Sequence, residues 1–180
     1  MSQIAYIGLG SNLDSPAGPP AEIVSAAIES LGTLGVIHAR SSLYRTEPVG
    51  YAEQPAFVNA VVALRTDMDP EKLLNCLLVI ERSFGRDRER SAAKGPRTLD
   101  LDLLLMGDLI FESPSLVVPH PELAERRFVL APLAEIAPNM VHPVLMRTVR
   151  QMLAELPDEG ANSRSAVQVL RPANPRQYQA

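Results

Sequence analysis

The sequence predicts an α+β fold, a ferredoxin-like sandwich in which helices flank a mostly antiparallel sheet. Two periodicities along the 180 residues carry this prediction. Apolar residues alternate in some segments, as in strands, and recur every three or four residues in others, as in helices. In chain order these segments are a strand, a helix, two strands, a helix and two strands, followed by helical segments. That order favours a ferredoxin-like sheet over a doubly wound parallel sheet.

The first predicted strand covers residues 4–7, which form a nearly continuous apolar run. The glycines of residues 8–12 predict a tight turn after it, because a dinucleotide-binding loop would need a third glycine and a helix directly behind it. Helical spacing over residues 21–31 predicts a helix. We then expect a strand over residues 36–45, a loop over 46–55, and a strand over 56–64 with Phe57, Asn59 and Val61 on one face.

The second half of the chain begins with a helix signal, because Asp69 suits the cap position and Pro70 the first helical position. After it we expect a helix to about Phe84, a charged loop over 86–95, a strand over 98–106, a turn at 107–108, a short return strand over 109–111, and helices near 122–127, 130–136 and 148–156. The segment after Pro157 is polar and lacks a period. Residues 1–160 are therefore expected to form the domain and 161–180 a flexible or loosely docked tail.

Composition narrows the class of protein. Cys76 is the only cysteine, so an intrachain disulfide is excluded, which fits a reducing compartment. The N-terminus shows no secretory signal, and no apolar run has the length of a membrane span. We therefore expect a cytoplasmic protein with no membrane partner. We also expect it to act as a monomer.

The most informative stretch is Gly95-Pro-Arg-Thr-Leu-Asp-Leu-Asp102. In a strand, alternate side chains share a face, so Asp100 and Asp102 point the same way while the leucines between them point to the other side. Two carboxylates held side by side repel each other unless a cation lies between them, and oxygen ligands suit Mg²⁺. The alternative explanation of this alternation, without a metal, is an edge strand whose acidic face is exposed to solvent.

A basic segment lies just upstream of these carboxylates. Between Arg82 and Arg97 the chain has six basic residues and two acidic ones, a local net charge of +4, whereas the whole chain has a net charge of −4. A small cationic patch on an acidic protein indicates a small polyanion as ligand rather than a nucleic acid duplex, which requires a wider basic face. Carboxylates beside arginines are what phosphoryl transfer requires.

Seven segments in order make the chain resemble the 6-hydroxymethyl-7,8-dihydropterin pyrophosphokinase family over residues 4–156. They are GLGSN at 8–12, SSLYRTEPVG at 41–50, QPAFVNAVV at 54–62, IERSFGRDR at 80–88, GPRTLDLDLLL at 95–105, VPHPEL at 118–123 and RRFVLAPL at 126–133. The resemblance implies a ferredoxin-like fold and an enzyme of folate biosynthesis. Such an enzyme transfers the diphosphate of ATP to the pterin hydroxymethyl group, releases AMP and uses two Mg²⁺ ions.

The resemblance also implies a role for each matching residue. Asp100 and Asp102 fall on the metal ligands, and they form the expected catalytic set together with Arg86 and Arg97. The expected ATP contacts are Glu81, Arg86, Arg88, Arg97, Leu103, Val117, His120 and Arg126. The expected pterin contacts are Thr46, Val49, Phe57, Asn59 and Phe128. The flat ring of Phe57 can stack on the pterin heterocycle, and the Asn59 amide can form hydrogen bonds with the polar edge of that heterocycle.

The sequence departs from the family pattern at two points, and three other classes of protein are alternatives to it. Lys94 stands where some members carry a tryptophan, and the loop over 86–95 is one residue longer than in those members. A two-metal nuclease or phosphatase would use the same carboxylates but leaves Phe57 and Asn59 without a role. A catalytically weak pterin- or ATP-binding module would lack a core Asp or Arg. A purely structural protein would not need two carboxylates on one face.

Overall fold

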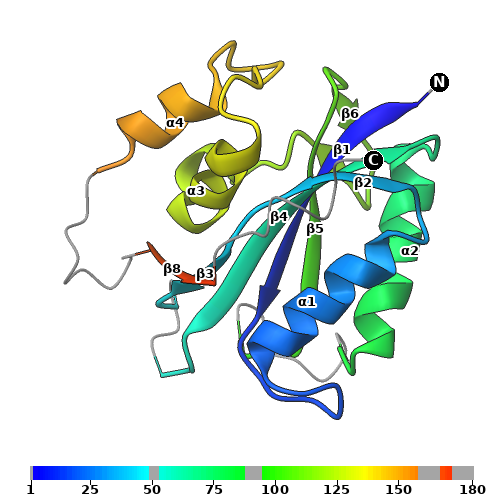
Figure 1. The fold of residues 1–180 in the computed structure, drawn as a ribbon. Coiled ribbons are helices and arrows are strands. Elements are labelled where there is room, and N and C mark those ends of the chain that lie inside the picture. Colours follow the sequence, from blue (N-terminus) through cyan, green and yellow to red (C-terminus); the bar gives the residue numbers. More distant parts are fainter. Residues whose placement is uncertain (1, 49–52, 88–94, 158–166, 172–180) are drawn as a thin grey trace.

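The computed structural model describes residues 2–48, 53–87, 95–157 and 167–171 (Figure 1). Its centre is an antiparallel sheet in which β1 (Gln3–Ser11) lies between β5 (Asp100–Met106) and β4 (Phe57–Thr66). On the other side of β4 lie β2 (Val36–Arg40) and β3 (Leu43–Thr46), and β3 pairs in turn with β8 (Val167–Arg171). The predicted α+β class and antiparallel sheet are confirmed.

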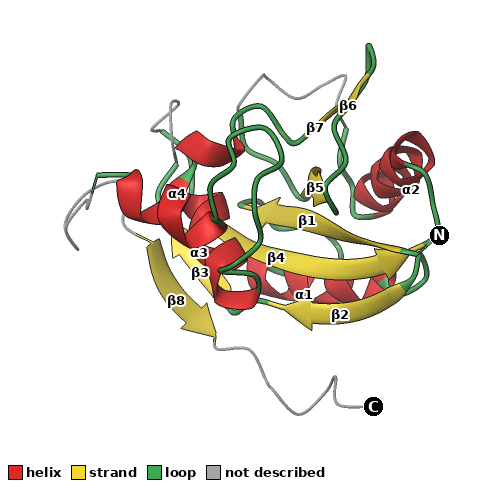
Figure 2. Ribbon diagram, turned by 90° about the horizontal axis from the view of Figure 1, so that it is seen from above, coloured by secondary structure: helices red, strands yellow, loops and turns green. Residues whose placement is uncertain are grey.

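Helices cover both faces of this sheet (Figures 1 and 2). On one face, α1 (Pro20–Leu31) and α2 (Pro70–Ser83) pack on buried side chains of β1, β4 and β5. On the other, a second cluster joins the sheet to α3 (Arg127–Ile136) and α4 (Val149–Glu155), with the short 3₁₀ helix Leu123–Glu125 beside them. In the described part of the chain no helix has the length and hydrophobicity needed to cross a bilayer.

The predicted start of α2 is confirmed, and a second local signal fixes the start of α4. The Asp69 carboxylate accepts a hydrogen bond from the Lys72 backbone N–H, and Pro70 is the first residue of α2. Thr148 caps α4 through a reciprocal pair of hydrogen bonds with Gln151. Both helices therefore begin where the sequence places their caps.

The predicted turn at residues 8–12 is wrong, because β1 continues through both glycines to Ser11. Gly8 pairs with Val61 on one side and Asp102 on the other, and Gly10 pairs with Asn59 and Asp100. Two neighbouring strands hold this central strand extended, which outweighs the local preference of glycine for turns.

Two other strand predictions need correction. Residues 36–45 form two strands, β2 and β3, which both pair with β4. The return strand expected at 109–111 does not pair with β5: it is β6 (Phe111–Glu112), and its partner is β7 (Val117–Val118). Strand β8 lies within residues 161–180, so part of the expected tail pairs with the sheet.

Candidate active site

A cleft of about 600 Å³ opens on the face of the sheet that α3 covers in part. Its floor is formed by β1, β4 and β5, and its walls come from the Arg97 segment, the His120 segment and the beginning of α3. The cleft is lined by ten of the residues predicted from the sequence: Thr46, Phe57, Asn59, Arg86, Arg97, Asp100, Asp102, His120, Arg126 and Phe128.

The strand register explains why residues from distant segments meet on this floor. Residues directly opposite each other in antiparallel strands point to the same face. Asn59, Gly10 and Asp100 form one such row across β4, β1 and β5, and Gly8 lies opposite Asp102 in the next row. Because the two central positions are glycines, the floor between the amide and the carboxylates carries no side chain.

The carboxylate end of the cleft is surrounded by arginines. Arg97 donates a hydrogen bond to Asp100 over 2.9 Å, and the Arg86 guanidinium lies 4.0 Å from the same carboxylate. Asp100 and Asp102 alternate along β5 on the cleft side, while Leu101 and Leu103 are buried in the core. Among the described residues no three His, Cys, Asp or Glu side chains converge as a complete metal cage. Two neighbouring carboxylates fit a Mg²⁺ ion that takes its other oxygens from phosphate and water.

The other end of the cleft is built for a flat polar ring. The Asn59 Nδ2 amide donates to Thr46 Oγ1 over 2.6 Å, and both residues are buried. The Asn59 Oδ1 atom lies on the Gly10 side, at 3.0 Å from the position that a Cβ on Gly10 would occupy. Phe57 and Phe128 supply aromatic faces, and each lies near an arginine: Arg97 at 5.2 Å and Arg126 at 5.7 Å from the ring centres.

His120 lines the cleft near Asp100 and Arg126, and its hydrogen bonding defines its tautomer. Its Nδ1 atom accepts from the Glu122 backbone N–H over 3.2 Å, which leaves Nε2 to carry the proton as a donor. Burial lowers the pKa of His120 below 6.5, and the charge of Arg126 lowers it further, whereas Asp100 raises it. A neutral imidazole donor therefore faces the cleft at neutral pH.

Five of the predicted contacts are not placed in this lining. Glu81 is 1% exposed, and its carboxylate accepts from the Leu101 backbone N–H over 2.8 Å, so it supports β5 from the α2 side. Leu103 is buried in the core, and Val117 lies on β7. Arg88 and Val49 lie outside the described residues, as does Lys94.

Asn12 lies behind the cleft lining and holds two of its residues, Gln54 and Arg97, a role that the sequence did not predict. It is 2% exposed, and it connects segments that are 42 to 85 residues apart. Its Nδ2 amide donates to Gln54 Oε1 and to the Pro55 carbonyl, both over 3.0 Å, and its Oδ1 accepts from the Arg97 backbone N–H over 2.8 Å. The available signal was a buried amide at the end of a strand, which needs polar partners.

Three comparisons place these features among known proteins. Residues 6–138 match the family model of 7,8-dihydro-6-hydroxymethylpterin-pyrophosphokinase. The chain is 43% identical to a 2-amino-4-hydroxy-6-hydroxymethyldihydropteridine pyrophosphokinase of Pseudomonas aeruginosa, covering 89% of this chain and 96% of the relative.

Larger proteins also contain a similar segment. The chain is 38% identical to the folic acid synthesis protein fol1 of Schizosaccharomyces pombe, covering 88% of this chain but spanning only 21% of that protein. A crystal structure of the wild-type HPPK-DHPS of Plasmodium falciparum shares the fold with a TM-score of 0.66 at 17% identity, over 86% of this chain and 45% of that one.

Proposed function

The chain belongs to the 7,8-dihydro-6-hydroxymethylpterin-pyrophosphokinase family, and on that premise we propose that its cleft joins ATP to a pterin alcohol. The diphosphate group of ATP is transferred to the hydroxymethyl group of 6-hydroxymethyl-7,8-dihydropterin, a step of folate biosynthesis, and AMP is released. One observation carries the proposal. The cross-strand row Asn59–Gly10–Asp100 places a buried amide at one end of the cleft floor and a carboxylate suited to bind a metal at the other, with a glycine between them.

The pterin occupies the end of the cleft with Phe57, Asn59, Thr46 and Phe128. Its ring stacks on the aromatic faces, and its polar edge meets the Asn59 amide, whose orientation is held by the hydrogen bond to Thr46. Val49, outside the described residues, is proposed to complete this end. Because Asn59 Nδ2 donates to Thr46, the Oδ1 atom is the group that accepts from an N–H of the ring.

The triphosphate occupies the basic end of the cleft. Arg86, Arg97 and Arg126 hold phosphate oxygens, which a guanidinium can bind in a bidentate manner, and the neutral His120 donates a hydrogen bond. Arg88, outside the described residues, is proposed to join them. We assign Glu81 an indirect role, since its hydrogen bond to Leu101 holds the strand that carries the carboxylates. Leu103 and Val117 have no part in this proposal.

Asp100 and Asp102 would hold the two Mg²⁺ ions expected with ATP. Bound Mg²⁺ would neutralise the phosphate charge and orient the phosphate oxygens. The chain's own groups position the reactants and stabilise charge: Arg97 lies against both Asp100 and the Phe57 ring, at the boundary between the two substrates.

The reaction is a single displacement at phosphorus. The hydroxymethyl oxygen attacks the β-phosphorus of ATP, the bond from that phosphorus to the oxygen bridging the α-phosphate breaks, and AMP leaves with that oxygen. The hydroxyl proton is released to solvent. The arginines around Asp100 offset the negative charge that develops on the attacking and leaving oxygens.

We further propose that the protein acts as a cytoplasmic monomer. Ten of the predicted site residues already meet in the cleft of a single chain, and a single cysteine suits a reducing compartment.

The test is AMP release from ATP and Mg²⁺, measured with and without 6-hydroxymethyl-7,8-dihydropterin. We expect AMP only when the pterin is present, together with a pterin product that has gained two phosphates. Formation of ADP would contradict diphosphate transfer. Folded protein that binds both substrates without turnover would support the weak binding module instead. The variant Asp100→Ala should bind the pterin but lose most turnover.

A further inference from the structure

The C-terminal strand β8 lies beside β3 at the edge of the sheet (Figures 1 and 2). Thr46 at the end of β3 lines the pterin end of the cleft. Strand β8 pairs antiparallel with β3, with Val167 opposite Thr46, Gln168 opposite Arg45 and Val169 opposite Tyr44. This strand lies outside residues 6–138, the part of the chain that matches the family model. Its side chains contribute little burial, since Val169 is 56% exposed and Leu170 50%. The attachment of β8 therefore rests mainly on its backbone pairing.

The strand that β8 covers carries a residue of the pterin end. Strand β3 has four residues, and its last, Thr46, is 3% exposed. The Thr46 hydroxyl accepts the short hydrogen bond from Asn59 Nδ2 that turns the Asn59 carbonyl oxygen toward the cleft. A four-residue strand with one free edge is easily displaced, because half of its backbone groups would then bond only to water. Pairing on both edges fixes the position of Thr46.

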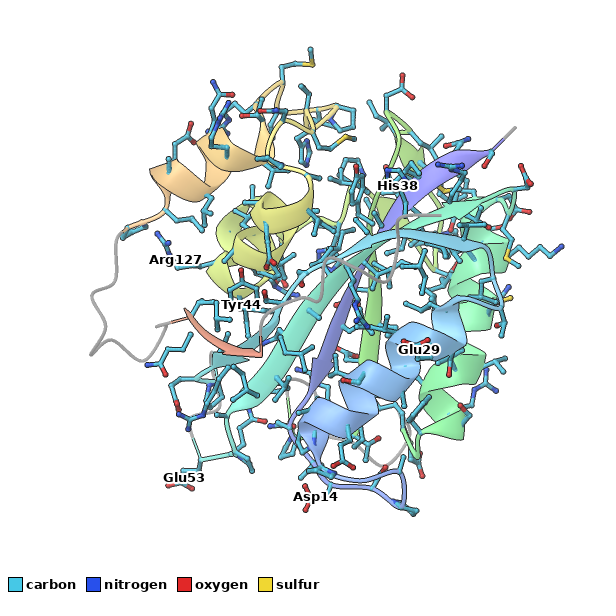
Figure 3. The ribbon with its side chains drawn as sticks, viewed as in Figure 1. Asp14, Glu29, His38, Tyr44, Glu53 and Arg127 are labelled. Carbon is cyan, nitrogen blue, oxygen red and sulfur yellow. The ribbon has the colours of Figure 1, made fainter. Side chains whose placement is uncertain are left out.

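Side chains reinforce the same corner. Glu135 on α3 accepts hydrogen bonds from the Tyr44 hydroxyl and from the backbone and hydroxyl of Ser42, and so joins β3 to α3. Figure 3 shows Tyr44 below α3, at the edge of the sheet that carries β3. Arg127 donates to the carbonyls of Leu156 and Pro157 over 2.9 Å, which holds the chain at the end of α4 against the cleft wall. The chain thus leaves α4 at the cleft and returns beside Thr46.

We propose that β8 is a positioning element for the pterin. By fixing β3 it fixes Thr46, and Thr46 fixes the direction of the Asn59 amide that recognises the heterocycle. The proposal rests on the proposed function, because it assumes that Asn59 faces a pterin. It assigns β8 an effect on pterin binding and no effect on ATP binding, since the arginines and carboxylates lie across the sheet on other segments.

The test breaks the pairing of β8 with the full chain retained. Residues opposite each other in antiparallel strands alternate between bonded and non-bonded pairs, so proline at two adjacent positions removes at least one inter-strand N–H. The test variant is Gln168→Pro/Val169→Pro. The matched control is Gln168→Thr/Val169→Thr, which keeps every backbone N–H and has high strand propensity. Binding of 6-hydroxymethyl-7,8-dihydropterin and of ATP with Mg²⁺ is measured separately by calorimetry.

We expect the proline variant to bind the pterin about fivefold more weakly, the effect of one hydrogen bond of ordinary net strength. ATP affinity should match that of the parent protein, which also shows that the variant is folded. The threonine control should bind both ligands as the parent does. Unchanged pterin affinity in the proline variant, or equal weakening for both ligands, would overturn the proposal.

A double-mutant cycle identifies the route. Thr46→Val removes the hydroxyl that orients Asn59 and keeps the side-chain shape. If β8 acts through Thr46, the proline pair should add little further loss of pterin affinity to Thr46→Val. Full additivity would contradict this route. If the parent protein itself binds no pterin, the proposed function has failed. If the parent binds the pterin and the proline variant binds it equally well, only the role of β8 has failed.

Discussion

Replacing Asn12 with alanine should destabilise the protein and slow turnover, because this side chain connects three segments of the site. The substitution removes the hydrogen bonds from Nδ2 to Gln54 and Pro55 and the one that Oδ1 accepts from Arg97. Gln54 is half-buried and finds water instead. Pro55 is exposed, so its carbonyl finds water as well, whereas the Arg97 N–H loses its partner beside Asn12, which is 2% exposed.

The magnitude follows from the Arg97 N–H, the one group that is left without a partner. A buried polar group that loses its partner costs about 1–3 kcal/mol, so the Arg97 N–H alone should lower the free energy of unfolding by about 1–3 kcal/mol. Gln54→Ala is the matched control: it removes only the acceptor at Gln54 Oε1 and leaves the Asn12 hydrogen bonds to Pro55 and Arg97 in place. Because Gln54 is half-buried, its loss should be about 1 kcal/mol or less.

Equilibrium unfolding in urea measures both variants against the parent protein. Turnover should also fall under conditions where the variant is folded, because the Arg97 segment carries a guanidinium that contacts Asp100 and lies over Phe57. An alanine variant with the parent's unfolding midpoint and turnover would refute this account of Asn12. Equal destabilisation by Asn12→Ala and Gln54→Ala would show that the bond to Arg97 contributes nothing.

Four further outcomes are expected. Asp102→Ala should remove most turnover with little change in stability, which steady-state kinetics with Mg²⁺ and thermal unfolding would show; near-normal rates would exclude it as a metal ligand. Arg97→Ala should lower kcat by an amount equivalent to about 2–4 kcal/mol, with Arg97→Lys recovering only part of it; an unchanged rate would remove Arg97 from the site. Gly10→Ala should raise the KM for the pterin more than that for ATP, because the new methyl group would lie 3.0 Å from Asn59 Oδ1; equal changes in both would contradict the assigned floor. The lowered pKa of His120 means that the unfolded chain binds this proton more readily, so stability should fall as the pH drops below 6.5, and His120→Asn should reduce that dependence in urea titrations; identical pH profiles would contradict it.

Features with a local cause could be predicted from the sequence. The alternation around Asp100 placed two carboxylates on one face, and the same rule placed Phe57 and Asn59 together on β4. Period 2 is a property of any strand, so it needs no knowledge of the partner strands. The cap at Asp69 is equally local.

Features that depend on distant partners could not be predicted in this way. The glycines of β1 are extended because β4 and β5 pair with them, and the pairing of β6 with β7 likewise depends on the rest of the fold. Asn12 meets Arg97 across 85 residues of sequence. Strand β8 carries no strong period, because most of its side chains are exposed, and its place is set by the open edge of β3.

The central claim is that both substrates meet on the floor between Asn59 and Asp100. The most direct measurement is a crystal structure with a non-hydrolysable ATP analogue, the pterin and Mn²⁺ in place of Mg²⁺, with the manganese located by anomalous scattering. We predict manganese at Asp100 and Asp102 and the pterin ring against Phe57 and Asn59. Manganese away from both carboxylates, or a pterin bound elsewhere, would contradict the account.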